Sequence, residues 1–131
     1  MRTEFFTHLM FEGQAQEAMD LYLSAFDDAE VNSVEHFPND HEHLAGKIRL
    51  AKFRLKNSEF LCIDSPTRHE FSFTPSMSIF VEFDDETELK HVLSQLSVEG
   101  KTLMPLDNYG FSELFVWFQD RFGVSWQLNL R

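Results

Sequence analysis

Hydrophobic and polar positions follow the same succession of periods in the two halves of the chain. In the first half, the aromatic-rich segment 3–11 (TEFFTHLMF) predicts a strand that meets a turn. Apolar residues spaced three and four apart over 14–26 then predict an amphipathic helix. Three further strands are expected at 30–37, 48–55 and 59–64, the last two forming a hairpin. The first half is therefore predicted to be a βαβββ unit.

The second half repeats this order after a polar linker at 66–75 that contains two prolines. Segment 77–83 predicts a strand, and Asp85 with Glu88 three residues later predicts the capped start of a helix. The remaining strands are expected at 101–106, 112–119 and 124–130. The predicted fold class is α+β, with two βαβββ modules in a single domain. Module one spans 1–65 and module two spans 76–131.

A direct comparison of the two halves supports this repeat. Sliding the chain by 70 positions, or by 63 for the last strands, pairs apolar residues of matching elements: Leu9 with Ile79, Met19 with Leu89, Leu23 with Leu93, Phe26 with Leu96, and Ile63 with Trp126. Identities are few. The repeat is therefore one of hydrophobic pattern and element order.

Charge and cysteine content exclude several classes of partner. The chain has 131 residues, the size of one domain, and a formal net charge of −11, which repels phosphate backbones and anionic membrane surfaces. We therefore expect neither nucleic acid nor a membrane as a partner. Cys62 is the single cysteine, so no intrachain disulfide forms and a reducing cytoplasm is the expected compartment. No apolar run reaches the length of a signal peptide or a membrane span.

Several blocks of sequence resemble one superfamily. They are HLMFEGQAQEAMDLYLSAF, the hairpin GKIRLAKFRLKNSEFLCIDS, the stretch SMSIFVEFDDETEL, and EGKTLMPL followed by WFQDRFGVSWQLNL. Together they resemble the vicinal oxygen chelate superfamily, which includes glyoxalase I, extradiol dioxygenases and the bleomycin and fosfomycin resistance proteins. The PhnB-like branch is the most similar. Its members are often labelled demethylubiquinone methyltransferase-like, but this chain has no glycine-rich nucleotide loop for a methyl donor.

The resemblance implies a glyoxalase-like fold, in which each module forms a cupped mixed sheet and the two cups face each other around a cavity. Many relatives bind a divalent metal there through four inward positions, which correspond to His8, Asp64, Ser78 and Gln127. Neutral Ser78 and Gln127 are poor ligands for such an ion. The site is thus implied to be degenerate, with no firm cofactor and at most a weak divalent metal. Relatives also commonly form homodimers, and the 15 phenylalanines favour an extra buried surface.

Two of these residues, His8 and Asp64, each have two possible roles. His8 lies on an apolar strand, where it is either a satisfied core histidine or a ligand or general base oriented by Asp64. Asp64 precedes Ser65-Pro66, so it either belongs to the site or caps that turn.

Aromatic side chains form either the walls of a ligand pocket or packing in the core. Strand alternation groups Phe60 with Cys62 and Asp64 on one face, and Ser78 with Phe80 and Glu82 on one face of another strand. Phe60 and Phe80 are therefore the predicted pocket walls. Cys62, in the apolar run FLCI, is predicted to be a buried and inert thiol.

The segment 36–43 contains His36, His41 and His43, and its H-x-H spacing can bind zinc. A solvated loop at the mouth of a cavity explains the same residues, and we expect a lid rather than a metal site.

These features leave two functions open. The first is the binding of a small organic molecule in the cavity between the modules, with His8, Asp64, Ser78 and Gln127 at its polar base and Phe60 and Phe80 as its walls. The alternative is a metal-dependent lyase, isomerase or dioxygenase of the glyoxalase superfamily with a remodelled metal site. The neutral metal positions and the aromatic residues favour binding, and the substrate is not identified by the sequence.

Overall fold

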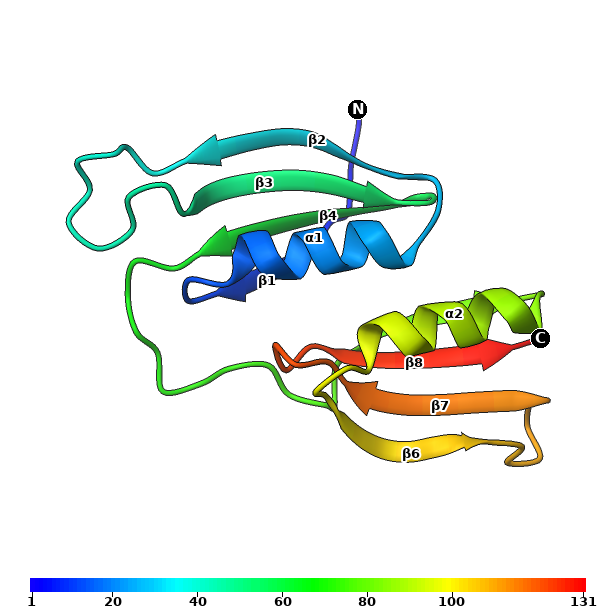
Figure 1. Ribbon diagram of the computed structural model, residues 1–131. Coiled ribbons are helices and arrows are strands. Elements are labelled where there is room, and N and C mark those ends of the chain that lie inside the picture. Colours follow the sequence, from blue (N-terminus) through cyan, green and yellow to red (C-terminus); the bar gives the residue numbers. More distant parts are fainter. The chain divides into compact units, whose positions relative to one another are not determined.

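The computed structural model describes residues 1–131 and divides them into two compact units, Met1–His69 and Glu70–Arg131. Figure 1 shows that each unit has the order βαβββ. The first contains β1 (Thr7–Phe11), α1 (Ala15–Ala25), β2 (Ala29–His36), β3 (Ile48–Leu55) and β4 (Ser58–Asp64). The second contains β5 (Ser78–Phe83), α2 (Glu86–Leu96), β6 (Lys101–Asp107), β7 (Leu114–Gln119) and β8 (Ser125–Leu130). The predicted α+β fold of two βαβββ modules is confirmed.

The first unit is a four-stranded mixed sheet with strand order β1-β4-β3-β2 and one face covered by α1. The parallel pair β1–β4 and the antiparallel hairpin β3–β4 place every second residue against the helix. On that face the ring of Tyr22 stacks on Phe53 at 6.5 Å between centroids, and Phe53 stacks on Phe60 at 5.2 Å. The opposite face of this sheet carries no helix.

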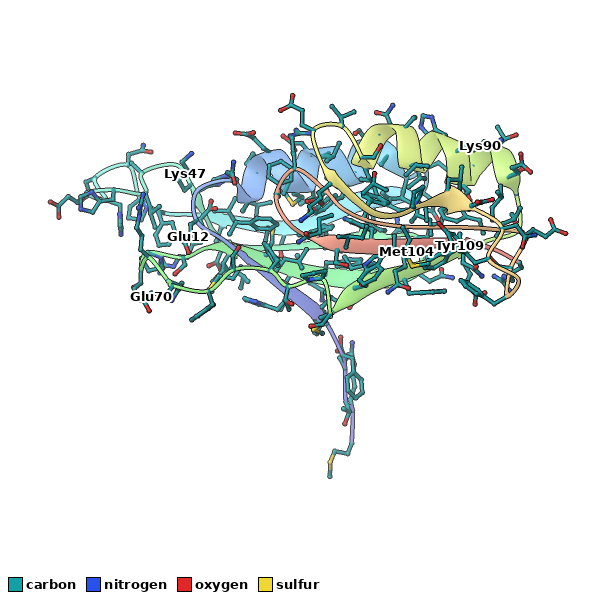
Figure 2. The ribbon with its side chains drawn as sticks, turned by 90° about the horizontal axis from the view of Figure 1, so that it is seen from below. Glu12, Lys47, Glu70, Lys90, Met104 and Tyr109 are labelled. Atoms are coloured by element: carbon teal, nitrogen blue, oxygen red, sulfur yellow. The ribbon has the colours of Figure 1, made fainter.

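Strand β1 is shorter than the predicted strand 3–11, because it begins at Thr7. Thr7 is opposite Phe60, and β4 begins only two residues before Phe60, at Ser58. The same register sets Thr3 opposite Lys56, in the β3–β4 turn, where no strand is available for pairing. Residues 1–6 therefore extend away from the sheet (Figure 2), and the Phe5 side chain is 90% exposed.

The second unit repeats this architecture, with strand order β5-β8-β7-β6 and α2 over one face. Asp85 caps α2 as predicted, because its side chain accepts a hydrogen bond from the Glu88 backbone N–H at 3.3 Å. The helix presents Leu89, Val92 and Leu96 to the sheet, and all three are fully buried. Neither helix of the chain has the length and apolar character that crossing a membrane requires.

The turn between β7 and β8 contains the sequence D-x-F-G-x-x-W, from Asp120 to Trp126. Asp120 Oδ1 accepts hydrogen bonds from the backbone N–H groups of Phe122 and Val124, at 2.9 and 3.1 Å. Asp120 Oδ2 accepts from the indole Nε1 of Trp126 at 2.9 Å. Gly123 has a φ of +93°, in the region that favours glycine. These four residues therefore hold the turn, and Arg121, which is exposed, makes none of these bonds.

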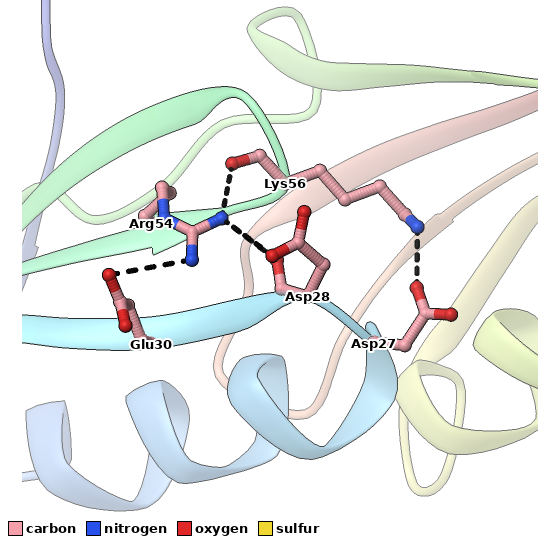
Figure 3. A network of polar contacts seen from close by, with 5 residues as sticks. All are labelled: Asp27, Asp28, Glu30, Arg54 and Lys56. Carbon is pink, nitrogen blue, oxygen red and sulfur yellow. Dashed lines mark hydrogen bonds and ion pairs between the residues drawn. The ribbon is translucent and has the colours of Figure 1, made fainter.

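An ion-pair network joins the turn after α1 to the β3–β4 hairpin (Figure 3). Arg54 Nη1 donates to Asp28 Oδ1 at 3.1 Å and Arg54 Nη2 lies 3.5 Å from Glu30, while Lys56 Nζ lies 2.5 Å from Asp27. The hydrogen bond from Lys56 lowers the pKa of Asp27, and the hydrogen bond to Asp28 raises the pKa of Arg54. Because these charges are already paired at the surface, we assign the network to the hairpin and not to a ligand site.

Cys62 is buried on the helix-covered face, as predicted, with 1% of its surface exposed. Burial, with a smaller contribution from the Asp64 charge, raises the pKa of its thiol from 9.0 to about 12. A folded-state pKa above the unfolded value means that the thiol contributes stability below pH 9 and that this stability is lost as the pH rises toward 12.

We expect the native protein to resist labelling by a thiol-specific disulfide reagent at pH 8 and to react with one equivalent in denaturing urea, because the thiolate is the reactive form. The measurement is the absorbance of the released chromophore over time. Fast native labelling at the rate of a free cysteine would contradict the burial.

Candidate ligand-binding face

His8 and Asp64 lie on opposite faces of the first sheet. His8 is opposite Leu61 in the β1–β4 pair and is exposed on the helix-free face. Asp64 is opposite Phe11 and is 1% exposed, on the face that α1 covers. The sheet itself separates the two side chains. The structure therefore does not bring them together as a histidine and its orienting carboxylate.

The carboxylate of Asp64 binds backbone groups and has a structural role. Its Oδ1 accepts hydrogen bonds from the backbone N–H groups of Gly13 at 2.8 Å and Ala15 at 2.9 Å, and its Oδ2 accepts from Ile48 at 3.0 Å. Helix α1 has no side-chain cap of its own at Gln14. Asp64 supplies that cap from β4 and also binds the start of β3, so both of its oxygens are occupied by backbone groups.

The alignment of the two modules was one residue out of register in their last strands. Leu9 is opposite Cys62 in the first sheet, and its counterpart Ile79 is opposite Trp126 in the second. The counterpart of Trp126 is therefore Cys62, not Ile63. A one-residue slip moves a side chain to the other face of a sheet, so Asp64 and Gln127 do not occupy corresponding faces of the two sheets.

The predicted pocket wall Phe60 also lies under α1. It is 3% exposed and stacks on Phe53, so it packs in the core of the first unit. Phe80, by contrast, is 53% exposed on β5. It is opposite Gln127, on the face of the second sheet that carries no helix.

The helix-free face of the second sheet gathers polar side chains into a connected group. Ser78 Oγ and Ser125 Oγ are 2.6 Å apart, and Gln127 Nε2 donates to Ser78 Oγ at 3.2 Å. Trp117 Nε1 donates to Ser125 Oγ at 2.9 Å. Two predicted residues, Ser78 and Gln127, are thus brought together. We call Ser78, Phe80, Trp117, Ser125 and Gln127 the polar-aromatic group.

Four strands position this face. The parallel pair β5–β8 sets Ser78 opposite Ser125 and Phe80 opposite Gln127, and β7 sets Trp117 opposite Gln127. Met104 of β6 is opposite Trp117. The alternate residues of β8, Trp126, Leu128 and Leu130, are apolar and buried, and they face α2. The face can therefore contact a flat apolar ligand at Phe80 while hydroxyl and amide groups orient it.

The histidine-rich segment forms an irregular loop between β2 and β3. His41 Nδ1 accepts hydrogen bonds from the backbone N–H groups of His43 and Leu44, at 3.3 and 3.0 Å. The His41 ring also packs on Phe37, with centroids 4.9 Å apart. Lys47 at the end of this loop donates to the Gly13 carbonyl oxygen at 3.0 Å. His41 therefore organises the loop, and the predicted motion of a lid stays a prediction.

The residues at the four implied metal positions do not fit a divalent ion. Asp64 has both oxygens bound to backbone N–H groups, and Ser78 and Gln127 are neutral and bonded to one another. No group of three or more His, Cys, Asp or Glu side chains in the chain is placed to hold a metal. A divalent ion requires several anionic oxygen or imidazole ligands, so no chemistry is assigned to a metal here.

Two βαβββ units with these sheets define the fold of the vicinal oxygen chelate proteins. The fosfomycin resistance protein FosX from Listeria monocytogenes has this fold with 10% identity and a TM-score of 0.61, over 100% of this chain and 94% of that chain. At that identity the likeness concerns the fold alone.

The chain belongs to the family described as 3-demethylubiquinone-9 3-methyltransferase, whose model matches residues 3–129. A putative member of that name, the PhnB protein from Bacillus cereus, is 43% identical with a TM-score of 0.94, over 98% of this chain and 100% of that chain. Protein PA1353 from Pseudomonas aeruginosa is 23% identical with a TM-score of 0.81, over 99% and 98% of the two chains, and shows the fold alone. No curated protein matches the chain. The PhnB-like resemblance of the sequence is confirmed.

Three residues of this face were missed by the sequence analysis: Trp117, Ser125 and Asn129. Ser125 and Asn129 lie two residues on either side of Gln127, so period-two alternation from Gln127 is the signal that places them on the same face. Trp117 was not among the predicted pocket walls. Its indole N–H bond to Ser125 follows only from the β7–β8 register.

Proposed function

We propose that this PhnB-like protein binds a small organic molecule on the helix-free face of its second sheet. The hydrogen-bonded hydroxyl and amide groups of Ser78, Ser125 and Gln127, beside the exposed ring of Phe80, carry this proposal. The role predicted for His8, on the helix-free face of the first sheet, stays a prediction. Asp64 and Phe60 are left out of the proposed site because they pack under α1.

The side chains on this face favour ligand binding over catalysis. Phe80 has 53% of its surface open, and an exposed aromatic residue next to fixed hydrogen-bonding groups is typical of a ligand site. No nucleophile with an adjacent base is present in the polar-aromatic group, since its hydroxyls bond to one another and to the Pro75 carbonyl oxygen. The methyl transfer in the family's name needs a methyl donor, and no glycine-rich loop for one is present, so methyl transfer is not proposed.

A neutral aromatic alcohol, naphthalen-2-ylmethanol, is expected to bind this face and to move the indole N–H signal of Trp117 in ¹⁵N–¹H NMR spectra. The signal of Trp126 is the internal control, because that residue is fully buried on the other face. Phe80→Ala should weaken binding about tenfold through lost apolar contact. Val98→Ala, at a position 51% exposed after α2, is the matched variant that leaves binding unchanged. Equal movement of both indole signals, or of neither, contradicts the proposal.

We also propose that the protein acts in the cytoplasm as a homodimer. Large apolar side chains remain exposed in the single chain, among them Met77 at 78%, Phe111 at 65% and Phe71 at 64%. Such side chains are commonly covered by a second subunit. Light scattering at micromolar concentration is expected to return about twice the chain mass of 15.4 kDa. A mass equal to that of one chain would exclude the dimer.

A further inference from the structure

One row of residues crosses the second sheet with an excess of hydrogen-bond acceptors. Asp107 of β6 is opposite Phe115 of β7, Phe115 is opposite Asn129 of β8, and Asn129 is opposite Glu82 of β5. We call these four residues the acceptor row. It lies four residues along β8 from Ser125, or about 13 Å at the usual rise of a strand. Neither carboxylate of the row makes an ion pair with a Lys, Arg or His side chain.

The centre of the acceptor row contains a buried oxygen that has no partner. Asn129 is 9% exposed, and its Oδ1 makes no hydrogen bond. Its Nδ2 donates to Glu82 Oε2 at 3.4 Å. If the amide of Asn129 were flipped, its oxygen would face the Glu82 carboxylate, which is unfavourable because both groups are acceptors. The amide nitrogen therefore faces Glu82, and Oδ1 is turned away from it. An unpaired buried acceptor is unfavourable, and a donor from a ligand would remove that cost.

Aromatic rings surround the same end of the sheet. The Phe115 ring is met edge-on by Phe111, with centroids 5.1 Å apart, and by Tyr109, with centroids 6.0 Å apart. Phe111 lies in the loop 108–113 between β6 and β7 and is 65% exposed, so it is a side chain that can move to admit a ligand. Aromatic faces attract cations, and so do the two carboxylates of the row.

We propose that the ligand of this face carries an ammonium group that binds the acceptor row. The N–H groups of the cation would donate to Asn129 Oδ1 and Glu82, while its apolar part packs on Phe80 and the aromatic rings. The net charge of −11 attracts a cation over longer distances and repels an anion. This inference rests on the proposed function and adds the chemical class of the ligand to it.

Three probes with the same ring test the inference: naphthalen-2-ylmethanamine, naphthalen-2-ylmethanol and naphthalene-2-carboxylate. Their dissociation constants are measured at pH 7 by the shift of the Trp117 indole signal. We expect the amine to bind about tenfold more tightly than the alcohol, as a charge-assisted hydrogen bond requires, and the carboxylate to bind most weakly. Equal affinity of amine and alcohol, or tighter binding of the carboxylate, overturns the inference and leaves the proposed function standing. Absence of binding by all three overturns both.

Two variants test whether the acceptor row causes the preference for the amine over the alcohol. Glu82→Gln keeps an acceptor for Asn129 but removes the charge, and Asn129→Leu removes the unpaired oxygen while keeping the branching and the number of side-chain heavy atoms. Each is expected to reduce the amine's affinity to that of the alcohol while leaving the affinity of the alcohol unchanged. Glu99→Gln removes the same charge from the exposed turn after α2 and should have no effect. An unchanged tenfold preference in Glu82→Gln overturns the inference, and unfolding curves check that each variant is folded.

Discussion

Replacing Asp64 by alanine is expected to destabilise the protein by about 3 kcal/mol or more, the cost of leaving three backbone donors, two of them buried, without their partner. The donors are the N–H groups of Gly13, Ala15 and Ile48, which connect the start of α1 and the start of β3 to the end of β4. Because α1 has no other side-chain cap, its first turn loses its only side-chain partner. Urea unfolding followed by circular dichroism measures the change in the free energy of unfolding.

A graded series separates the charge of Asp64 from its hydrogen bonds. Asp64→Asn keeps one oxygen for Gly13 and Ala15 but turns an N–H₂ group toward the Ile48 N–H, so about 1–3 kcal/mol should be lost. Asp84→Asn, at an exposed position without a hydrogen bond, should change stability by less than about 0.5 kcal/mol. If Asp64→Ala unfolds like the unmodified protein but loses ligand binding, Asp64 is a site residue and the structural role is wrong.

Replacing Asp120 by alanine is expected to have an effect of similar size in the second unit. The substitution removes the carboxylate that accepts from the backbone N–H groups of Phe122 and Val124 and from the indole N–H of Trp126. Trp126 is fully buried, so its indole cannot turn to water. We expect a loss of about 3 kcal/mol or more in the free energy of unfolding and a changed chemical shift of the Trp126 indole proton.

A double-mutant cycle tests the bond between Asp120 and Trp126 directly. Trp126→Phe removes the indole donor, so Asp120→Asn should cost less in that background than in the unmodified protein. The difference between the two costs is the coupling energy of the pair, expected at about 1.5–3 kcal/mol for a hydrogen bond to a charged group. Additive losses would mean that the two side chains do not interact. Trp117→Phe is the control, because Trp117 bonds to Ser125 and not to Asp120.

The elements of this fold follow from local pattern. Apolar residues at helical spacing predicted 14–26, and the helix runs from Ala15 to Ala25. The strand predicted at 48–55 has those bounds in the structure. These signals are local because a helix face or a strand face is encoded by residues close together in the chain. The start of β1 was wrong by four residues, since strand length also depends on how far the partner strand extends.

The candidate site was predicted only in part, and the reason is register. Ser78, Gln127 and Phe80 share the helix-free face of the second sheet, as alternation along β5 and the parallel β5–β8 register require. Asp64 does not share the corresponding face of the first sheet with His8. The weak internal repeat could not distinguish one residue of slip, and that slip exchanges the two faces of a strand.

The sequence by itself determined the two βαβββ modules, the family, the buried thiol of Cys62 and the cap at Asp85. Each of these can be recognised from residues close together in the chain or from sequence motifs. Only the tertiary structure decided that Asp64 and Asp120 hold backbone donors, and that Asn129, between Glu82 and Phe115, has an unpaired Oδ1. These contacts join residues from different strands and turns. Their partners are set by strand pairing, which a single sequence does not encode locally.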